Sequence, residues 1–276
     1  MVEAAFFDLD KTIVARSSPL ALSKTFFREG LLTRGSLLKG LYAQLVFHLM
    51  GADEKKMERM REEAAKLTAG WEQDKVRQVV TEVLEDVISP LIYAEALELM
   101  EQHRAAGRLV CIVSSSPEEI VEPMSQMLAV DHWIATKPQV VDGRYTGELE
   151  FYAYGPAKAE AIERLANETG IDLDGSFAYS DSPTDLPMLE LVGHPVPVNP
   201  DRALRRIASE RGWTVENFRN PVSLRSRLPQ FPQLPSMPRL SRPELERKEV
   251  AVAGATVAAL GLVTWWVSRR TSSRSG

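Results

Sequence analysis

The chain has 276 residues, 44% of them hydrophobic and 26% charged, so it can bury a substantial core and is not an intrinsically disordered chain. Its formal net charge is −5, and residues 236–276 hold seven basic and three acidic side chains, a local charge of +4, so the preceding part carries about −9. An acidic globular part excludes nucleic acid as the expected partner, and a single cysteine, Cys111, excludes an intramolecular disulfide.

The first predicted element is a strand that begins near residue 3 and ends in FFDLDKT (residues 6–12). Asp8 and Asp10 occupy alternate positions, so they point the same way from an extended chain. Two carboxylates this close repel each other, and a divalent cation would relieve the repulsion. A strand that ends in an Asx turn would show the same pair, so the pair alone decides nothing. Because the chain enters this strand without a signal peptide, we expect a cytoplasmic domain.

Residues 19–105 show helical patterns throughout and no clear strand. Apolar residues recur at i, i+3 and i+4, and the segments end near Gly or Pro. We therefore predict an all-helical insertion, residues 17–105, which we call the cap. Its segment LYAQLVFHLM is apolar nearly all round, so it either packs inside the cap or forms a groove that faces lipid. A helix over 92–105 leads back to the core.

The elements after the cap alternate between strands and helices. In chain order we predict a buried strand in LVCIVSSS (109–116), a helix over 117–129, a hairpin turning at Asp142-Gly143, a helix from Pro156, a strand in SFAYS (176–180), a short helix in TDLPMLELVG (184–193), a strand in HPVPV (194–198), a helix in DRALRRIASERG (201–212) and a last strand in WTVEN (213–217). This alternation predicts an α/β core, residues 1–16 and 106–227, with a Rossmann-like parallel sheet and helices on both faces. Cys111 falls in a buried strand, where an inert thiol is expected.

Polar side chains stand where these strands end. In a parallel α/β sheet the carboxyl ends of the strands share one edge, and ligands bind there. The residues that the sequence brings to this edge are Asp8, Asp10, Thr12, Ser114, Ser115, Lys158, Asp181 and Asp185. Taken singly, each has an ordinary structural interpretation, such as a helix cap for Ser114, a solvated lysine for Lys158 and turn carboxylates for Asp181 and Asp185.

Together these residues fit the chemistry of a phosphate monoester. One carboxylate can attack phosphorus and form an acyl phosphate, which divides one difficult displacement into two easier ones. A second carboxylate can protonate the leaving oxygen and then deprotonate the attacking water. Mg²⁺ needs hard oxygen ligands and screens the carboxylate from the phosphate dianion. A hydroxyl, a lysine and helix-terminal amides can hold the phosphoryl oxygens.

Four stretches in order, FFDLDKT, VCIVSSS, the Lys158 of GPAKAEAI and YSDSPTDLPML, resemble the motifs of the haloacid dehalogenase (HAD) phosphohydrolase superfamily. The long helical insertion between the first two motifs resembles subclass IB, the phosphoserine-phosphatase-like branch, and the resemblance covers roughly residues 3–220. It implies that Asp8 is the nucleophile and Asp10 the acid/base. It further implies Mg²⁺ ligation by Asp8, the Asp10 carbonyl and Asp181, phosphate binding by Ser114, Ser115 and Lys158, and supporting roles for Thr12 and Asp185.

The sequence departs from that branch in three places. Lys11 stands where the family usually has a small residue, and Ser115 stands where phosphoserine phosphatases usually have glycine. Phosphoserine phosphatases typically carry a glutamate nine residues after the nucleophile, which receives the substrate ammonium; here that position is Ser17, next to Arg16. We therefore expect Arg16 and Ser17 to take part in substrate selection, and phosphoserine is in doubt as the substrate.

The C-terminal part suggests a membrane tether. Residues 228–248 form a proline-rich linker in which four prolines stand three apart, the polyproline II period. Residues 249–268 are predicted as a single transmembrane helix, because the 18 uncharged residues Val250–Val267 span roughly 27 Å at 1.5 Å per residue. A basic tail, residues 269–276, follows. We expect anchoring at the inner face of the cell membrane, and small residues spaced by four permit a homodimer.

The main hypothesis from the sequence is a Mg²⁺-dependent phosphatase that acts on a phospholipid-type monoester such as phosphatidylglycerophosphate or lysophosphatidate. The alternative is a phosphatase of a soluble metabolite, phosphoserine included. Two hypotheses belong to other classes, a phosphoaccepting signalling domain and a membrane-tethered binding module with a degenerate site. The signalling domain is disfavoured by the helical insertion, and the degenerate module by a competent residue type at every catalytic position.

Overall fold

The computed structural model describes residues 2–28 and 66–222, which lie within the first of two compact units, Met1–Gln233. Several predictions from the sequence fall on residues outside these ranges. They are the cap segment LYAQLVFHLM, the proline-rich linker, the transmembrane helix with its small-residue pairs, and the basic tail. In the described ranges no helix is long and apolar enough to cross a membrane.

A six-stranded sheet forms the centre of the described unit, in the order β5-β4-β3-β1-β6-β7. The strands are β1 (Ala4–Phe7), β3 (Leu109–Pro117), β4 (His132–Val141), β5 (Arg144–Phe151), β6 (Phe177–Ser180) and β7 (His194–Pro197). All neighbours pair in parallel except β4 and β5, which form the predicted hairpin. At its turn Asp142 and Gly143 have φ values of 49° and 73°, the left-handed pair that a tight hairpin turn needs.

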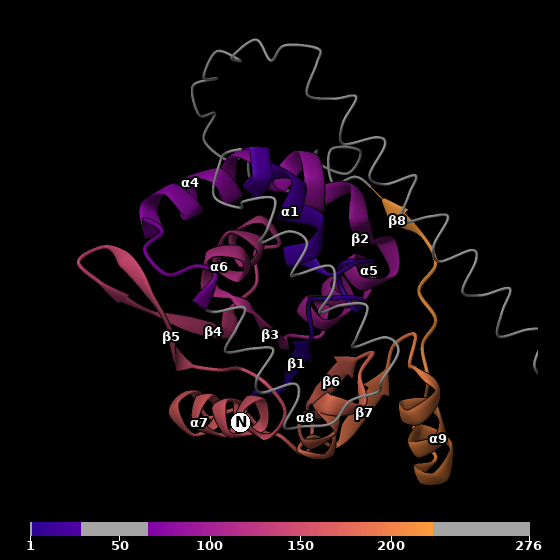
Figure 1. Cartoon of the computed structure of the whole chain (residues 1–276). Coiled ribbons are helices and arrows are strands. Elements are labelled where there is room, and N and C mark those ends of the chain that lie inside the picture. The colour runs from indigo at the N-terminus through magenta and orange to yellow at the C-terminus, as the bar shows by residue number, and fades with distance from the viewer. Residues whose placement is uncertain (1, 29–65, 223–276) are drawn as a thin grey trace, which may run out of the picture. The chain divides into compact units, whose positions relative to one another are not determined.

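Helices cover both faces of this sheet, as the alternation of elements predicts (Figure 1). Side chains alternate along each strand, so Phe7 joins one apolar cluster and Phe6 the other. The Phe7 cluster contains residues of α4 (Gln73–Val83), α5 (Ala94–Ala105) and α6 (Glu118–Met127). The Phe6 cluster contains residues of α7 (Pro156–Thr169), α8 (Leu186–Glu190) and α9 (Arg202–Arg211), together with Cys111, which is buried as expected. The predicted α/β fold with both sheet faces covered is confirmed.

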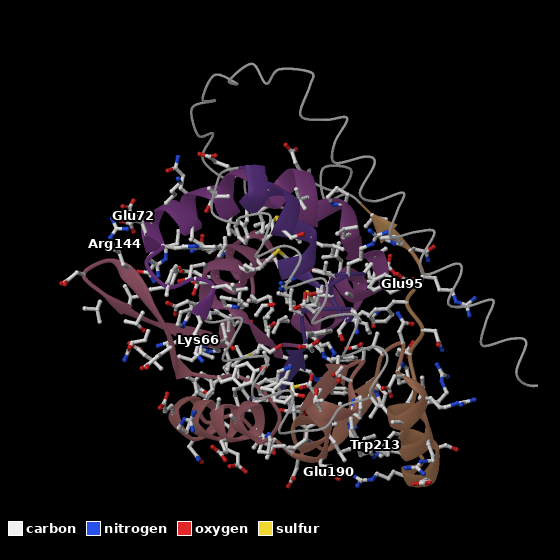
Figure 2. All side chains as sticks on the ribbon, in the orientation of Figure 1. Lys66, Glu72, Glu95, Arg144, Glu190 and Trp213 are labelled. Carbon is white, nitrogen blue, oxygen red and sulfur yellow. The ribbon has the colours of Figure 1, made fainter. Side chains whose placement is uncertain are left out.

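The described parts of the cap are mostly helical. The helix α1 (Ser18–Arg28) follows the first strand, and α4 continues into a π-turn (η1, Leu84–Ile88) and a 3₁₀ turn (η2, Ser89–Leu91). Figure 2 shows Glu72 and Arg144 beside each other, an ion pair between the residue before α4 and the start of β5. The cap is therefore tied to the hairpin as well as to its own two linkers.

The prediction of no clear strand between residues 19 and 105 is wrong at residues 92–93, within the described ranges. β2 (Ile92–Tyr93) pairs antiparallel with β8 (Pro221–Val222). Pro90 interrupts the helical pattern here, because proline cannot continue a helix. The chain segments that enter and leave the cap then bond to each other, Ala15 N to the Leu91 carbonyl at 2.7 Å and Tyr93 N to the Ile13 carbonyl at 2.9 Å. The helix α5, which follows, packs against β1 and β3.

The prediction of a last strand in WTVEN is also wrong. Only Glu216 makes a bridge, to Val198. The next backbone groups that form hydrogen bonds are those of Phe218, and their partner is a side chain. Asn199 donates to the Phe218 carbonyl and accepts from Phe218 N, both at 3.0 Å. A side chain that bonds the backbone in this way competes with a strand ladder.

Candidate active site

Lys158 links two of the four motifs through a pair of short hydrogen bonds. The helix α7 starts at Pro156, after Gly155 with φ 55° and ψ −128°, a conformation that favours glycine. Lys158 therefore lies in the first helical turn, and its side chain points inward with 2% exposure. Its Nζ donates to Asp8 Oδ1 at 2.7 Å and to Asp185 Oδ2 at 2.8 Å. Burial by itself would lower the pKa of Lys158, but the carboxylates of Asp185 and Asp8 outweigh it and raise the pKa.

Asp8 follows directly after β1 at the carboxyl edge of the sheet. Its backbone N–H donates to the Tyr179 carbonyl at 2.9 Å, which extends the β1–β6 pairing by one residue and fixes its place. The side chain is 6% exposed. Burial raises the pKa of Asp8 well above its ordinary value, and the Lys158 ammonium offsets this only in part. A further positive charge would therefore favour the ionised form that a nucleophile needs.

Asp185 is held by two groups at the start of α8. It ends the 3₁₀ turn η3 (Pro183–Asp185), which the Ser182 side chain caps by accepting from Thr184 N. Asp185 Oδ2 accepts from Lys158 and, at 2.7 Å, from the hydroxyl of Ser180. No role for Ser180 is predicted from the sequence, because a serine at the end of a strand carries no local signal of its partner.

Asp10 contacts a different set of groups. Its Oδ1 accepts from the backbone N–H of Ser18 at 2.5 Å, and its Oδ2 accepts from the Ser116 hydroxyl at 2.7 Å. Ser18 is the first residue of α1, so this carboxylate touches both the sheet edge and the entry to the cap. Asp10 and Lys11 form part of a tight turn in which Lys11 has φ 63° and its N–H bonds to the Val14 carbonyl at 2.6 Å.

Asp181 lies at the same edge, directly after β6. Its carboxylate forms an ion pair with the exposed Lys11 at 3.6 Å. Burial raises the pKa of Asp181 to about 6, and the Lys11 ammonium reduces this rise. Lys11, which departs from the family pattern, thus supplies a solvent-exposed positive charge beside one of the predicted metal ligands.

The remaining predicted residues lie around these carboxylates. Ser114 is buried in the second half of β3, and its Oγ accepts from Ser116 N at 3.1 Å, which leaves its own hydroxyl proton for another acceptor. The Ser115 carbonyl accepts from the Thr136 hydroxyl at 2.8 Å. Thr12 is fully buried, and among the described residues its hydroxyl has no hydrogen-bond partner. Arg16 and Ser17 lie in the segment that enters the cap, Arg16 exposed and Ser17 half-buried.

The predicted ligands can hold a metal ion only if a backbone carbonyl and water complete the coordination. In the described ranges no three His, Cys, Asp or Glu side chains are grouped closely enough to hold a metal ion. Asp8 and Asp181 together with the Asp10 carbonyl offer hard oxygen donors, the type that Mg²⁺ prefers. Both carboxylates also have a raised pKa, so each would gain from a nearby cation. These residues are therefore compatible with Mg²⁺ held by two carboxylates, one carbonyl and water.

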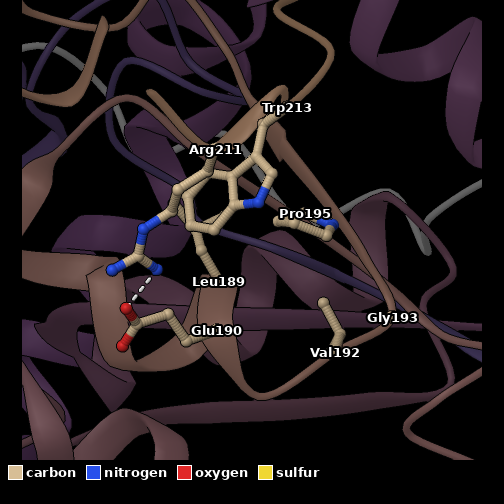
Figure 3. A pocket seen from close by; sticks show the side chains of 7 residues that line it. All are labelled: Leu189, Glu190, Val192, Gly193, Pro195, Arg211 and Trp213. Atoms are coloured by element: carbon tan, nitrogen blue, oxygen red, sulfur yellow. Dashed lines mark ion pairs between the residues drawn. The ribbon is translucent and has the colours of Figure 1, made fainter. Parts of the chain in front are cut away.

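A separate hollow lies at the opposite end of the strands (Figure 3). Its volume is about 550 Å³, and it lies between the end of α8, the start of β7 and the end of α9. Arg211 forms an ion pair with Glu190 there and lies over the Trp213 ring at 5.0 Å from its centroid. None of the predicted site residues lines this hollow, so it is distinct from the cluster around Lys158.

Comparison with known proteins agrees with this fold. Residues 5–190 match the model of the haloacid dehalogenase-like hydrolase family. The chain is 51% identical over 97% of its length to a Streptomyces azureus protein named for inhibition of morphological differentiation, covering 94% of that protein. It is 54% identical over 82% of its length to a probable phosphatase of Mycobacterium tuberculosis, covering 79% of it. A phosphoserine phosphatase of the same organism is 34% identical over 79% of the chain and 72% of its own length.

A solved structure has the same fold over most of this chain. A protein of unknown function from Bordetella pertussis is 29% identical, with a TM-score of 0.70 over 78% of this chain and 98% of that one. The fold is a doubly wound α/β sheet with carboxylates at the carboxyl edge of its parallel strands. The chain belongs to the haloacid dehalogenase-like hydrolase family and is a HAD-family phosphatase. Membership of this family excludes the phosphoaccepting signalling domain.

Proposed function

We propose that this phosphatase hydrolyses a small, soluble phosphomonoester through an aspartyl-phosphate at Asp8. The observation that supports the proposal most directly is the buried Lys158 ammonium, which bonds Asp8 and Asp185 at once. Placing three charged groups out of water costs several kcal/mol per ion, roughly, and purely structural cores rarely keep them. Such a cluster at the carboxyl edge of an α/β sheet is expected where catalysis needs it.

The reaction takes two steps. In the first, an oxygen of the Asp8 carboxylate bonds to phosphorus, the bond between phosphorus and the ester oxygen breaks, and the proton of Asp10 passes to the leaving oxygen. In the second, the Asp10 carboxylate takes a proton from water, the water oxygen bonds to phosphorus, and the bond to Asp8 breaks. Inorganic phosphate leaves, and both aspartates return to their starting states.

Lys158 and Ser114 would stabilise this chemistry electrostatically. The ammonium of Lys158 orients Asp8 and lies where the phosphoryl oxygens would approach it. The hydroxyl of Ser114 has its proton free to donate to a phosphoryl oxygen. Bound Mg²⁺ would supply the positive charge that lets an anionic carboxylate meet a phosphate dianion.

A small soluble substrate has more support than a phospholipid. Two relatives, which match 82% and 79% of the chain, bear the names probable phosphatase and phosphoserine phosphatase. The phospholipid hypothesis and the expected place at the inner face of the membrane depend on Val250–Val267, which lies outside the described residues. Ser17 stands where phosphoserine phosphatases typically carry a glutamate. Phosphoserine is therefore one of the substrates to be tested and is not the proposed substrate.

A phosphate-release screen on the purified full chain tests the proposal. It compares an aryl phosphate, a panel of soluble metabolite monoesters including phosphoserine, and lysophosphatidate in bilayers. We expect the highest kcat/KM on a soluble monoester, and the same values after removal of residues 249–276. Turnover of the lipid substrate alone, lost with the same truncation, would overturn the proposed substrate class in favour of a tethered lipid phosphatase.

Metal removal supplies a further prediction for the same protein. Because Asp8 and Asp181 would otherwise face a phosphate dianion without compensation, activity should disappear in excess EDTA and return with added Mg²⁺. Phosphate release in the presence and absence of chelator is the measurement. Full activity in excess chelator would remove Mg²⁺ from the proposed site.

A further inference from the structure

Neither the sequence motifs nor the mechanism above assigns a role to Ser116. We propose that Ser116 is a positioning residue that holds the Asp10 carboxyl group in the orientation needed for proton transfer. Its hydroxyl donates to Asp10 Oδ2 at 2.7 Å, and its side chain is 3% exposed. The inference rests on the acid/base role proposed for Asp10.

The two oxygens of Asp10 are held from two sides. Ser18 N–H binds Oδ1 at 2.5 Å from the start of α1, and the Ser116 hydroxyl binds Oδ2 from the end of β3. Two donors on two different oxygens fix the plane of the carboxyl group. A carboxylate has about four acceptor sites, so each oxygen keeps a free position for the proton that moves in the reaction. The carboxyl group is thus oriented without being blocked.

The ordinary structural role of a serine before a helix does not account for this contact. A serine run ahead of α6 would be expected to cap the helix. Here the N-cap residue of α6 is Pro117, with no side-chain hydrogen bond to the helix. The backbone of Ser116 is fixed separately, because its N–H donates to Ser114 Oγ at 3.1 Å. The hydroxyl of Ser116 is therefore directed to Asp10 and not to the helix.

The expected effect of losing this hydroxyl depends on the leaving group. A general acid matters most when the leaving oxygen is basic, because an alkoxide needs a proton and a nitrophenolate does not. A hydrogen bond to a charged group commonly changes a rate or an equilibrium by about tenfold or more. For Ser116→Ala we expect kcat/KM to fall by about tenfold or more on an alkyl phosphate, and by less than about threefold on p-nitrophenyl phosphate. The ratio kcat/KM is the correct quantity because it reports the steps up to phosphoenzyme formation.

Three further variants separate positioning from a general structural effect. Ser116→Thr keeps a hydroxyl and should restore most of the alkyl phosphate activity. Ser125→Ala removes another buried serine hydroxyl, which donates to the Glu122 carbonyl in α6. This variant should leave kcat/KM on both substrates unchanged. In an Asp10→Asn background, Ser116→Ala should add little further loss on the alkyl phosphate, because two residues that act through one group are not additive.

The full-length chain is assayed with both substrates, together with thermal unfolding of each variant. Equal losses on the two substrates, no loss, or an undiminished loss in the Asp10→Asn background would each overturn the proposal. A Ser116→Ala protein that is selectively slow on the alkyl ester and restored by Ser116→Thr supports it. A wild-type chain that hydrolyses neither ester would contradict the proposed function itself, and the role of Ser116 with it.

Discussion

Charged side chains are buried at the carboxyl end of the parallel strands and are largely exposed at the amino end. At the carboxyl edge Lys158, Asp8 and Asp185 are all buried, and Lys158 forms an ion pair with each of the two carboxylates. At the amino end the ion pairs lie on the surface: Arg108 binds Glu3 beside the starts of β1 and β3, and Arg211 binds Glu190 at the hollow, with both side chains 41% exposed. The same sheet thus has an internal charge cluster at one end and solvated pairs at the other.

This difference in burial shows which ion pairs could be explained by stability and which need a functional explanation. An exposed ion pair contributes about 0–1 kcal/mol, since water and salt screen it. A buried pair recovers its desolvation cost only with excellent geometry, and apolar residues of similar size often stabilise a fold as well or better. Stability therefore does not explain the charges around Lys158, whereas the proposed nucleophilic attack on a phosphate ester would require them.

His103 is a buried titratable group toward the amino end of the described sheet, and it is neutral. His103 of α5 packs against the rings of Phe7, Phe177 and Tyr179, and its Nε2 lies 2.8 Å from the Tyr179 hydroxyl. Burial, together with the nearby Arg108 guanidinium, lowers the pKa of His103 to about 4. Where catalysis makes no demand, the fold buries the uncharged form of the side chain.

The largest effect is expected from Asp8→Asn. The amide keeps the shape of the side chain but cannot form the acyl phosphate, so kcat should fall by roughly 10³-fold or more while the fold is retained. Phosphate release and circular dichroism measure the two quantities. Activity that persists in a preparation free of contaminating phosphatase would remove Asp8 from the nucleophile's place and end the functional interpretation of the carboxyl edge.

Lys158→Met should have the next largest effect. Loss of the ammonium removes charge stabilisation worth about 10²-fold in kcat on the scale of oxyanion-hole donors. It also leaves Asp8 and Asp185 buried without their counter-ion, which should lower the free energy of unfolding by roughly 3 kcal/mol at pH 7. The exposed Lys137 provides a matched control, and Lys137→Met should change neither quantity appreciably. Near-wild-type turnover in Lys158→Met would mean that the buried cluster is structural.

The pH dependence of stability tests the neutral His103. A histidine whose folded pKa lies at about 4, against 6.5 when unfolded, contributes stability that is present above pH 6.5 and is lost as the pH falls toward 4. The loss should reach about 3 kcal/mol, from 1.36 kcal/mol per pKa unit. Chemical denaturation at several pH values, compared with His103→Phe, isolates this group from carboxylates such as Asp181. Equal slopes in the two proteins would contradict the lowered pKa.

The smallest effect is expected at the surface pair of the hollow. Glu190→Gln should change the free energy of unfolding by less than about 1 kcal/mol and kcat by less than about twofold, because both partners are half-solvated. Denaturation and phosphate release measure these. A large loss of activity would assign this end of the sheet a role in catalysis and remove the contrast between the two edges.

The sequence predicted the elements and the edge at which the site forms, because both follow from local patterns. Apolar alternation and helical spacing identify strands and helices along the chain, and parallel strands bring their carboxyl ends together whatever lies between them. The strand missed at Ile92–Tyr93 and the strand wrongly expected in WTVEN both depend on partners distant in sequence, β8 in one case and the Asn199 side chain in the other.

The residue types of the site were determined by the sequence alone, since four ordered motifs identify Asp8, Asp10, Lys158 and Asp185 without coordinates. Their pairing was decided only by the tertiary structure. Lys158 and Asp8 are 150 residues apart, and Ser116 and Asp10 are 106 apart. Nothing local distinguishes the serine that binds Asp10 from its two neighbours in the run Ser114–Ser116, because that choice depends on how β3 and β1 align and on which hydroxyl then faces a carboxylate.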